Sequence, residues 1–325
     1  MTVMKRILVT GVGGAPGCAL ARELQRLGCT VVAADADPHA PGLLLPGVEP
    51  HVTVPADGSG YRAATLRLCD EARPDAVVST VERELTQFVA LRGPLAERGA
   101  ATWLPEPGTV ELCGDKHRFA LAMAEHGIPT PRTVLPRGLD QVPNGPLVVK
   151  PRHGQGAQGV HVRRTRERAR VLCGLVPGPI VQERVAGREF TADCLVDRGG
   201  RASAILRYRL LVKGGLAVVS RTFSDPAVAA AVRAVLATVG ITGACCVQGF
   251  PLDGDGPDRV VVTEANARVD GGFPASVAAG ADDVGQLVRG LFHQDIDHAR
   301  LTYRPDVTLT KYYETLATSE GTAPR

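Results

Sequence analysis

The sequence lacks the features of several large classes of protein. Its 37 Lys and Arg nearly balance 34 Asp and Glu, and no basic stripe carries interleaved aromatic residues, which disfavours a nucleic-acid partner. The densest basic run, 163–170, is interpreted as a solvated turn and helix face. No apolar stretch reaches the roughly 18 to 20 residues that a membrane span needs, and the first residues show no signal-peptide pattern. We therefore expect a cytoplasmic protein that binds neither nucleic acid nor membrane.

Metal-binding cysteine patterns are also absent. The eight cysteines are scattered, with no C-x-x-C pair and no histidine at the spacing of a zinc site. Cys245 and Cys246 are adjacent, so on a strand they would face opposite sides and could not hold one metal together. We interpret the cysteines as reduced thiols that serve in packing.

The N-terminal third does contain a clear alternation. Three short β-branched runs, 6–10, 30–34 and 76–80, are separated by amphipathic segments, and this order predicts a parallel sheet flanked by helices. A stretch with two prolines and a glycine, 104–108, then marks a boundary near residue 105. A chain of 325 residues is long enough for two or three subdomains.

Beyond that boundary the pattern becomes α+β. Thr109 is expected to cap one helix that runs to about Gly127. A second helix is expected at 226–239, and the connection 251–257 is interpreted as a hairpin loop. Strands are predicted at 146–150, 159–162, 180–185, 190–196, 244–250 and 259–264. The predicted fold class is therefore α/β plus α+β, in three parts: residues 1–105, 106–186 and 187–325.

The first glycine-rich loop, 11–17, follows a strand and precedes a helix, with Asp35 at the end of the next strand. This position fits a dinucleotide fingerprint, but G-x-G-x-x-G would need glycine where Pro16 stands. A structural turn or a small-substrate site is favoured over NAD or FAD. An NAD-dependent reductase or epimerase stays an alternative, although the chain contains no Y-x-x-x-K pair.

The second glycine-rich loop has the character of a phosphate-binding lid. Lys150 ends a strand, and Gly154, Gly156 and Gly159 follow. Glycines let backbone N–H groups approach phosphate oxygens, which the lysine ammonium can neutralise. No G-K-S or G-K-T follows, so the loop is not a Walker motif.

The sharpest signal is an alternating polar strand face. Glu264, Asn266 and Arg268 point to one side because side chains alternate along a strand. Carboxylate and amide oxygens are ligands that magnesium accepts, and a guanidinium can clamp a phosphoryl or carboxylate group. Gln248 on the preceding strand adds another amide oxygen. The alternative is an exposed polar strand face without function.

Together these residues resemble the ATP-grasp superfamily, particularly the branch similar to the synthetase domains of carbamoyl-phosphate synthetase. The likeness runs from about Cys113 to Gly280. It implies an N-terminal parallel-sheet pre-ATP-grasp domain followed by a two-lobed ATP-grasp fold, whose small lobe carries the lid and whose C-terminal lobe carries the metal site. Cys246 and Ala267 depart from the usual asparagine and proline, and neither change removes an oxygen ligand.

The resemblance also implies a role for each motif. Lys116 and Lys150 would touch nucleotide phosphates under the lid glycines, and Arg268 would meet the phosphate or acyl phosphate, which makes Lys150 and Arg268 the expected catalytic residues. Residues 182–185 would offer backbone groups to adenine, with Gln182, Glu183 and Val185 as binding positions. Glu189 would hold the ribose. The expected metal ligands are Gln248, Glu264 and Asn266.

The implied reaction is ATP-dependent amide formation. A small-molecule carboxylate would form an acyl phosphate, and an amine would capture it with release of ADP and phosphate. The implied cofactors are ATP and Mg²⁺, which Mn²⁺ could replace, and a homodimer is one assembly that the resemblance allows. The alternatives are a carboxylase or carbamoyl-phosphate-type kinase using bicarbonate, and a nucleotide-binding regulator without chemistry. Four basic residues are either part of the substrate pocket or an exposed basic strand: Arg207, Arg209, Lys213 and Arg221.

Overall fold

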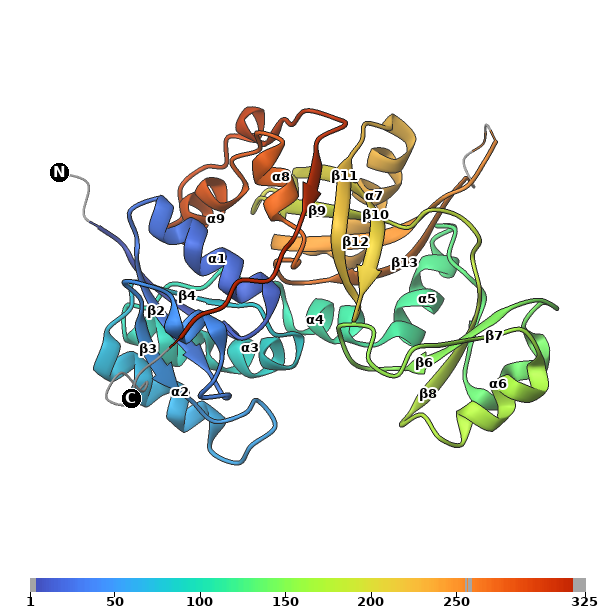
Figure 1. Cartoon of the computed structure of the whole chain (residues 1–325), viewed down its shortest axis with the longest axis horizontal. Coiled ribbons are helices and arrows are strands. Elements are labelled where there is room, and N and C mark those ends of the chain that lie inside the picture. The colour runs from blue at the N-terminus through green and yellow to red at the C-terminus, as the bar shows by residue number, and fades with distance from the viewer. Residues whose placement is uncertain (1–3, 255, 257–258, 318–325) are drawn as a thin grey trace.

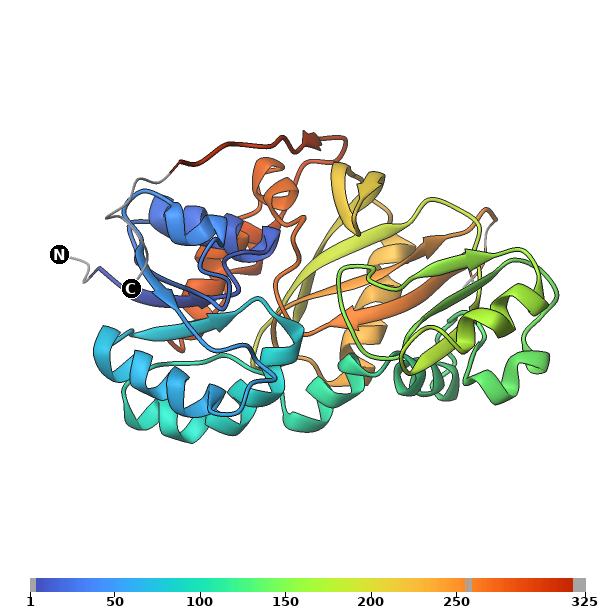
Figure 2. The same cartoon turned by 60° about the horizontal axis from the view of Figure 1, so that its bottom comes forward.

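The computed structural model describes residues 4–254, 256 and 259–317. Three sheets follow one another along the chain, and the helices pack between and around them (Figure 1). The first and last thirds of the chain lie side by side, while the middle third forms the opposite end (Figures 1 and 2). Among the described residues no helix is long and apolar enough to cross a membrane.

The first sheet is four-stranded and parallel, in the order β3-β2-β1-β4. Its strands are β1 (Arg6–Thr10), β2 (Thr30–Asp35), β3 (Glu49–Val52) and β4 (Ala76–Ser79). Alternate residues of β1 face opposite sides: Ile7 and Val9 pack with α1 (Ala15–Arg26), whereas Leu8 packs with α2 (Tyr61–Ala72) and α3 (Glu82–Glu97). The predicted parallel sheet with helices on both faces is confirmed.

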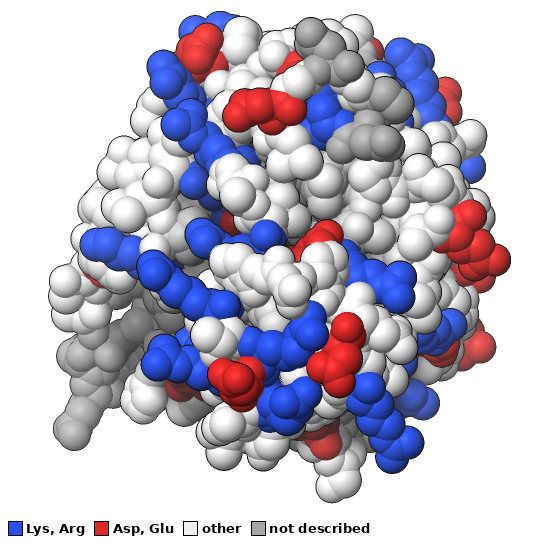
Figure 3. Space-filling view, turned by 90° about the vertical axis from the view of Figure 1, so that its right-hand side faces the viewer, with Lys and Arg blue, Asp and Glu red and all other residues white. Residues whose placement is uncertain are grey.

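The second sheet is small and antiparallel, in the order β5-β8-β6-β7. It contains β5 (Thr133–Val134), β6 (Leu147–Pro151), β7 (His161–Arg163) and β8 (Pro179–Glu183). Helix α6 (Arg166–Cys173) covers it through Ala169 and Leu172. The arginines of the basic run lie on this end of the molecule, where exposed Lys and Arg are mixed with Asp and Glu (Figure 3).

The third sheet has six strands in the order β13-β12-β9-β10-β11-β14. They are β9 (Phe190–Val196), β10 (Ala202–Lys213), β11 (Leu216–Thr222), β12 (Gly243–Pro251), β13 (Val260–Asn266) and β14 (Thr308–Thr310). Helix α7 (Pro226–Val239) packs on it. Strands β12 and β13 pair antiparallel as predicted, but part of the expected hairpin loop, 255 and 257, lies outside the described residues.

The expected helix from Thr109 to Gly127 is two helices. Asp115 separates α4 (Pro107–Gly114) from α5 (Lys116–Glu125), because its carboxylate accepts hydrogen bonds from the backbone N–H groups of His117 and Arg118 and so caps α5. Thr109 caps neither helix, since its hydroxyl donates to the carbonyl of Val239 at 2.9 Å. Both helices pack into the core of the six-stranded sheet, although the sequence groups them with the small lobe.

Helices α8 (Pro274–Ala278) and α9 (Asp283–Leu291) link the ends of the chain. Leu287 and Leu291 of α9 share one apolar cluster with Leu20 and Leu24 of α1, and Figure 1 shows α9 beside α1. The described C-terminal segment also crosses to the first domain, where Glu314 forms an ion pair with Arg22. The N-terminal and C-terminal parts are thus held together by a shared core.

Candidate active site

One cavity of about 860 Å³ is lined by residues from all three sheets. Twelve of the thirteen predicted site residues line it: Lys116, Lys150, Gly154, Gly156, Gln182, Glu183, Val185, Glu189, Gln248, Glu264, Asn266 and Arg268. The exception is Gly159, whose backbone has φ +67° and packs on the ring of Pro151. Gly159 therefore shapes the base of the lid and does not face the cavity.

The start of α5 holds a lysine at the cavity wall. Lys116 is buried, and its ammonium donates to the carbonyl of Gly154 in the lid at 2.6 Å. The carboxylate of the preceding residue, Asp115, accepts a hydrogen bond of 2.7 Å from Arg152 Nε. Arg152 follows β6, the strand that contains Lys150. Although burial opposes ionisation, Arg152 and the backbone N–H of Arg118 hold the pKa of Asp115 at about 2. One aspartate therefore caps the helix and fixes the first residues of the lid.

Lys150 and Glu264 form the electrostatic centre of the cavity. Burial lowers the pKa of Lys150, while the nearby Glu264 carboxylate favours the charged ammonium. Burial alone would raise the pKa of Glu264, but the charges of Lys116 and Lys150 outweigh it and lower that pKa. The carboxylate is thus kept ionised beside two cations, which suits a group that must meet a metal ion and phosphates.

The expected metal ligands lie on two paired strands. Gln248 of β12 stands directly opposite Glu264 of β13, and Asn266 follows on the same strand. Asn266 Nδ2 donates to Glu264 Oε1 at 3.3 Å, which leaves its own amide oxygen available. The Gln248 amide oxygen instead accepts from Arg209 Nη1 at 2.9 Å. Glu264 and Asn266 therefore fit magnesium, whereas Gln248 would need Arg209 to release it.

The described residues contain no group of three His, Cys, Asp or Glu arranged to hold a metal ion. The expected ligand set has a single carboxylate, that of Glu264. Since Mg²⁺ is commonly bound through one or two carboxylates plus substrate phosphates, such a site would hold the ion together with a nucleotide.

The hinge between the second and third sheets offers a backbone donor to the cavity. The N–H groups of Glu183 and Arg184 donate to the carbonyls of Arg132 and Pro146 at 3.0 Å each. The Gln182 side chain turns away to Thr133. Among the described residues the N–H of Val185 has no acceptor, so it is the hinge amide best suited to a planar base.

Glu189 lies on the wall next to the hinge. Arg209 Nε stands 3.3 Å from its carboxylate. Burial raises the pKa of Glu189, and Arg209 opposes that rise. The carboxylate is therefore oriented from behind by Arg209, with its accessible edge toward the cavity.

Arg268 lies beside this centre together with Glu82, an acid that no motif in the sequence singles out. Burial raises the pKa of Glu82, the first residue of α3, against the charges of Lys116 and Arg268. Glu82 Oε2 and Arg268 Nε are both buried without a hydrogen-bond partner among the described residues. Glu82 comes from the N-terminal domain, and only the packing of the domains brings it here.

The lid contacts both neighbouring parts of the molecule. The side chain of Gln155 accepts from the backbone N–H of Glu82 at 2.9 Å. On the other side, the turn between β10 and β11 meets the lid so closely that a Cβ on Gly215 would overlap the carbonyl of Gly156. The lid is therefore held by contacts on both of its sides.

The four basic residues on β10 and β11 divide into two pairs. Arg207 and Arg209 both line the cavity, and Arg207 is fully buried by ion pairs with Asp193 and Asp270. Lys213 and Arg221 are exposed instead. The pocket interpretation thus fits the first pair and the exposed-strand interpretation fits the second.

The first glycine-rich loop faces the same cavity. Gly13, Gly14 and Pro16 line it together with Asp35. The carboxylate of Asp35 accepts from the Gly13 N–H at 2.7 Å, so an amide that could bind a pyrophosphate is taken by the chain itself. This arrangement favours the small-substrate interpretation of the loop over dinucleotide binding.

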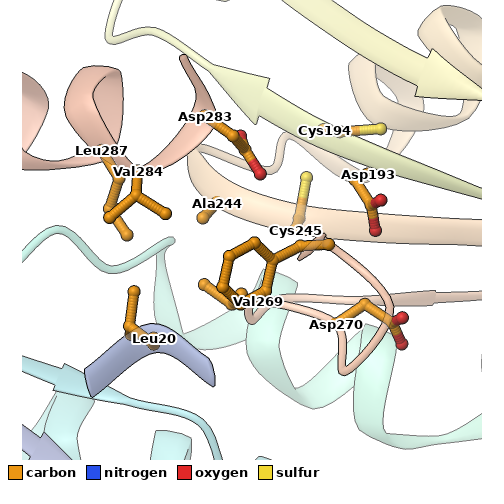
Figure 4. A pocket seen from close by; sticks show the side chains of 11 residues that line it. Leu20, Asp193, Cys194, Ala244, Cys245, Val269, Asp270, Asp283, Val284 and Leu287 are labelled. Carbon is orange, nitrogen blue, oxygen red and sulfur yellow. The ribbon is translucent and has the colours of Figure 1, made fainter. Parts of the chain in front are cut away.

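A second cavity lies between strands β9 and β12 of the six-stranded sheet and helices α1 and α9 (Figure 4). It measures about 10 Å³ and is lined by Asp193, Cys194, Cys245 and Asp283, among others. This volume is comparable to one water molecule. Burial, with Asp193 and Asp282 nearby, raises the pKa of Asp283 to about 7. The second cavity is therefore a packing defect beside a buried acid, too small for a substrate.

Comparison with known proteins agrees with this architecture. Residues 176–313 match the family described as ATP-grasp in the biosynthetic pathway with Ter operon. Over 166 residues the chain is 30% identical to the formate-dependent phosphoribosylglycinamide formyltransferase of Paraburkholderia xenovorans, a match that covers 49% of this chain and 39% of that protein. The chain thus spans well under half the length of this curated relative.

Two solved structures cover nearly the whole chain. The L-amino acid ligase of Bacillus licheniformis superposes with a TM-score of 0.73 at 20% identity, over 94% of this chain and 78% of that one. The biotin carboxylase domain dimer of Hydrogenobacter thermophilus 2-oxoglutarate carboxylase, in complex with MgADP, ADP and bicarbonate, superposes with a TM-score of 0.71 at 16% identity, over 95% and 74%. The chain therefore has the fold of these two enzymes, and its residues 176–313 match an ATP-grasp family.

Proposed function

We propose that the protein is an ATP-dependent carboxylate–amine ligase that acts on small-molecule substrates through an acyl phosphate. The observation that carries the proposal is the cavity in which Lys116, Lys150, Glu264 and Arg268 meet. Two ammonium groups, one ionised carboxylate and one guanidinium with a free Nε are the parts that phosphoryl transfer to a carboxylate requires.

The reaction needs two steps. A carboxylate oxygen of the acid attacks the terminal phosphorus of ATP, the bond from that phosphorus to the bridging oxygen breaks, and ADP leaves. The amine nitrogen then attacks the acyl carbon, phosphate departs with the oxygen it received, and the nitrogen loses a proton. Lys116 and Lys150 would offset charge on the transferred group, and Arg268, which lines the same cavity, would meet the acyl phosphate.

Mg²⁺ would be held by Glu264 and the amide oxygen of Asn266, and it supplies charge neutralisation on the phosphates. The free N–H of Val185 would meet the adenine, and the accessible edge of Glu189 would meet the ribose. The related carboxylase domain is in complex with MgADP, which supports ATP and Mg²⁺ as the ligands of this cavity. That domain is a dimer, so we include a homodimer in the proposal, to be tested by light scattering.

The lid has a chemical purpose in this scheme. An acyl phosphate reacts with water as well as with amines, so the cavity must exclude solvent while the intermediate exists. Gln155 and Gly156 hold the lid against the N-terminal domain and the β10–β11 turn, which provides that exclusion. No Ser-His-Asp arrangement is required, because phosphate is already a good leaving group.

The test supplies magnesium and ATP with pools of carboxylates and amines, and measures ADP, phosphate and product mass. Release of ADP that needs both an acid and an amine supports the ligase. Release that needs bicarbonate alone would support a carboxylase or carbamoyl-phosphate-type kinase, and AMP release would contradict the acyl phosphate. Nucleotide binding without any turnover would leave only a regulator.

A further inference from the structure

The guanidinium of Arg209 lies between three parts of the cavity. Its Nη1 donates to the amide oxygen of Gln248 at 2.9 Å, and its Nη2 donates to the carbonyl of Gly215 at 2.7 Å. Its Nε lies 3.3 Å from the carboxylate of Glu189. One side chain thus contacts the strand of expected metal ligands, the turn beside the lid, and the acid expected at the ribose.

These contacts hold Arg209 in place. Its side chain is only 10% exposed, and a guanidinium stays charged under ordinary conditions. If it withdrew from Gln248, the bond to Gly215 would break or the Glu189 carboxylate would lose its cation, and an enclosed charge without a partner is costly. Gly215 itself packs against Gly156 of the lid, which limits how far the turn can move. Arg209 is therefore expected to stay on Gln248.

The guanidinium makes Gln248 a poor metal ligand. The amide oxygen faces Arg209, and the Nε2 group beside it is a hydrogen-bond donor, which cannot bind a cation. A divalent ion on the same oxygen would lie close to the guanidinium charge, and like charges at short range repel each other. Asn266 differs, because its Nδ2 donates to Glu264 and its oxygen accepts no hydrogen bond from a described residue.

A second divalent ion at this place would also need a carboxylate of its own. Mg²⁺ is commonly held by one or two carboxylates, and paired catalytic ions lie about 3.5 to 4 Å apart. Glu189, which precedes β9, is paired with Arg209. Asp270, which follows β13, is paired with Arg207. Of the cavity acids on or beside these two strands, Glu264 is the one left for an ion.

We propose that Arg209 withholds Gln248 from metal coordination, so that the cavity binds one divalent cation with the nucleotide, on Glu264 and Asn266. The guanidinium supplies, as a fixed charge, the positive charge that a second ion would bring to this end of the cavity. Arg209 is thus a positioning residue. The inference rests on the proposed function through its nucleotide site, and it does not depend on which acid and amine are joined.

The experiment counts the Mn²⁺ ions bound to the full chain with the non-hydrolysable β,γ-imido analogue of ATP. Equilibrium dialysis gives the number of ions, and electron paramagnetic resonance shows whether they are neighbours. We expect one Mn²⁺ for each bound nucleotide, with the spectrum of an isolated ion. Two ions for each nucleotide, with the broadened spectrum of ions about 3.5 to 4 Å apart, would overturn the inference.

Two matched substitutions compare the amide oxygens. Gln248→Met and Asn266→Leu each replace an amide by an apolar group of similar size. Asn266→Leu removes a ligand and should raise the Mn²⁺ Kd at least about 10-fold, whereas Gln248→Met should change it by less than about 3-fold. Equal weakening by the two substitutions would mean that Gln248 is a ligand, against the inference.

Removal of the guanidinium should open a second position. Gln248→Glu alone is the control and should still bind one ion, because Arg209 would pair with the new carboxylate. The double variant Gln248→Glu/Arg209→Met should bind two ions and give the broadened spectrum. A double variant that binds the nucleotide with a single ion would show that Arg209 does not limit the number of ions, and its assigned role would be wrong.

The outcomes separate the two proposals. If the wild type binds no Mn²⁺ with the nucleotide, the nucleotide site is wrong, and both proposals fail. If one ion binds but no combination of acid and amine causes ADP release, the ligase proposal fails while the assignment of Arg209 stands. If ADP release needs both an acid and an amine but two ions bind, only the assignment of Arg209 is overturned.

Discussion

Two clusters of buried charge lie on the six-stranded sheet, and they differ in how completely they are hydrogen-bonded. In the closed cluster, Arg207 donates to Asp193 at 2.8 and 3.0 Å and also pairs with Asp270, while Ser276 donates to Asp193 at 2.6 Å. In the open cluster, around Lys150 and Glu264, the atoms Arg268 Nε and Glu82 Oε2 have no partner among the described residues.

The comparison shows that burial alone does not identify a functional charge. Arg207 is 0% exposed, and its guanidinium is already paired with the carboxylates of Asp193 and Asp270, so it does not require a ligand. In the open cluster, Arg268 lines the cavity and its buried Nε has no acceptor among the described residues. Unfilled hydrogen-bonding capacity is what separates a binding centre from a structural network.

The largest expected effect falls on the open cluster. Glu264→Gln removes the only carboxylate of the proposed metal site, so turnover should fall by at least about 10³-fold. The free energy of unfolding should also fall, by about 1 to 3 kcal/mol, because buried Lys150 loses the carboxylate that offsets its charge. Steady-state ADP release and urea unfolding measure the two quantities. A variant that is inactive because it is unfolded would break the comparison.

A substitution in the closed cluster should mainly lower stability, not turnover. Arg207→Met leaves Asp193 and Asp270 without their cation, and should lower the free energy of unfolding by about 3 to 5 kcal/mol. Arg221→Met is the control, since Arg221 pairs with Asp306 at the surface and should matter little. Loss of turnover in a fully stable Arg207→Met variant would mean that this cluster, too, is catalytic.

Asp283 offers a pH-dependent test beside the closed cluster. Its pKa is about 7 in the folded protein against an ordinary value of 3.8, so the native state holds a proton that the unfolded chain has lost. Stability should therefore fall as pH rises from about 4 to about 7. Asp283→Asn should flatten this fall and raise the free energy of unfolding at pH 8 by about 2 to 4 kcal/mol. Thermal unfolding at pH 5 and pH 8 gives the comparison, and equal slopes for both proteins would contradict it.

The smallest effect concerns the cap of α5. Asp115→Ala removes the N-cap and the Arg152 ion pair, and should destabilise the protein by about 1 to 2 kcal/mol at pH 7. Because the pKa of Asp115 is held at about 2, the wild-type advantage should be present above pH 4 and vanish as pH falls toward 2. Urea unfolding across this range would show a constant difference if the cap carried no charge-dependent stability.

Alternation along strands allows much of the candidate site to be predicted from the sequence. It predicts that Glu264, Asn266 and Arg268 share one face, and Gln248 does stand opposite Glu264. The parallel sheet and the long helix at 226–239 follow from periodicity, because each buries a continuous apolar face. These features depend on neighbours within a few residues or one strand away.

Features that depend on distant partners were not predictable. Arg207 and Arg209 are two residues apart on β10 and share a face, yet Arg207 meets Asp193 and Asp270 whereas Arg209 meets Glu189. Nothing local to the strand distinguishes them. Glu82 likewise comes from another domain, more than 180 residues before Arg268 in the sequence.

The break at Asp115 escapes prediction for a different reason. An aspartate followed by helix-forming residues is a recognised capping signal, but Gly114 and Asp115 lie inside a segment that is apolar and helical on both sides. Periodicity on both sides favours a single helix, whereas the cap divides the segment into α4 and α5. Arg152, which follows β6, also donates to the Asp115 carboxylate, and this distant partner is not visible in the local sequence.

The close approach of Gly215 to Gly156 has a consequence for the yield of the reaction. Any side chain at position 215 would press on the lid carbonyl, and Gly215 also has φ +77°, which other residues adopt with difficulty. A lid held slightly ajar would let water intercept the acyl phosphate. The number of ADP molecules released for each amide formed is therefore set, in part, by the contact between these two glycines of the cavity wall.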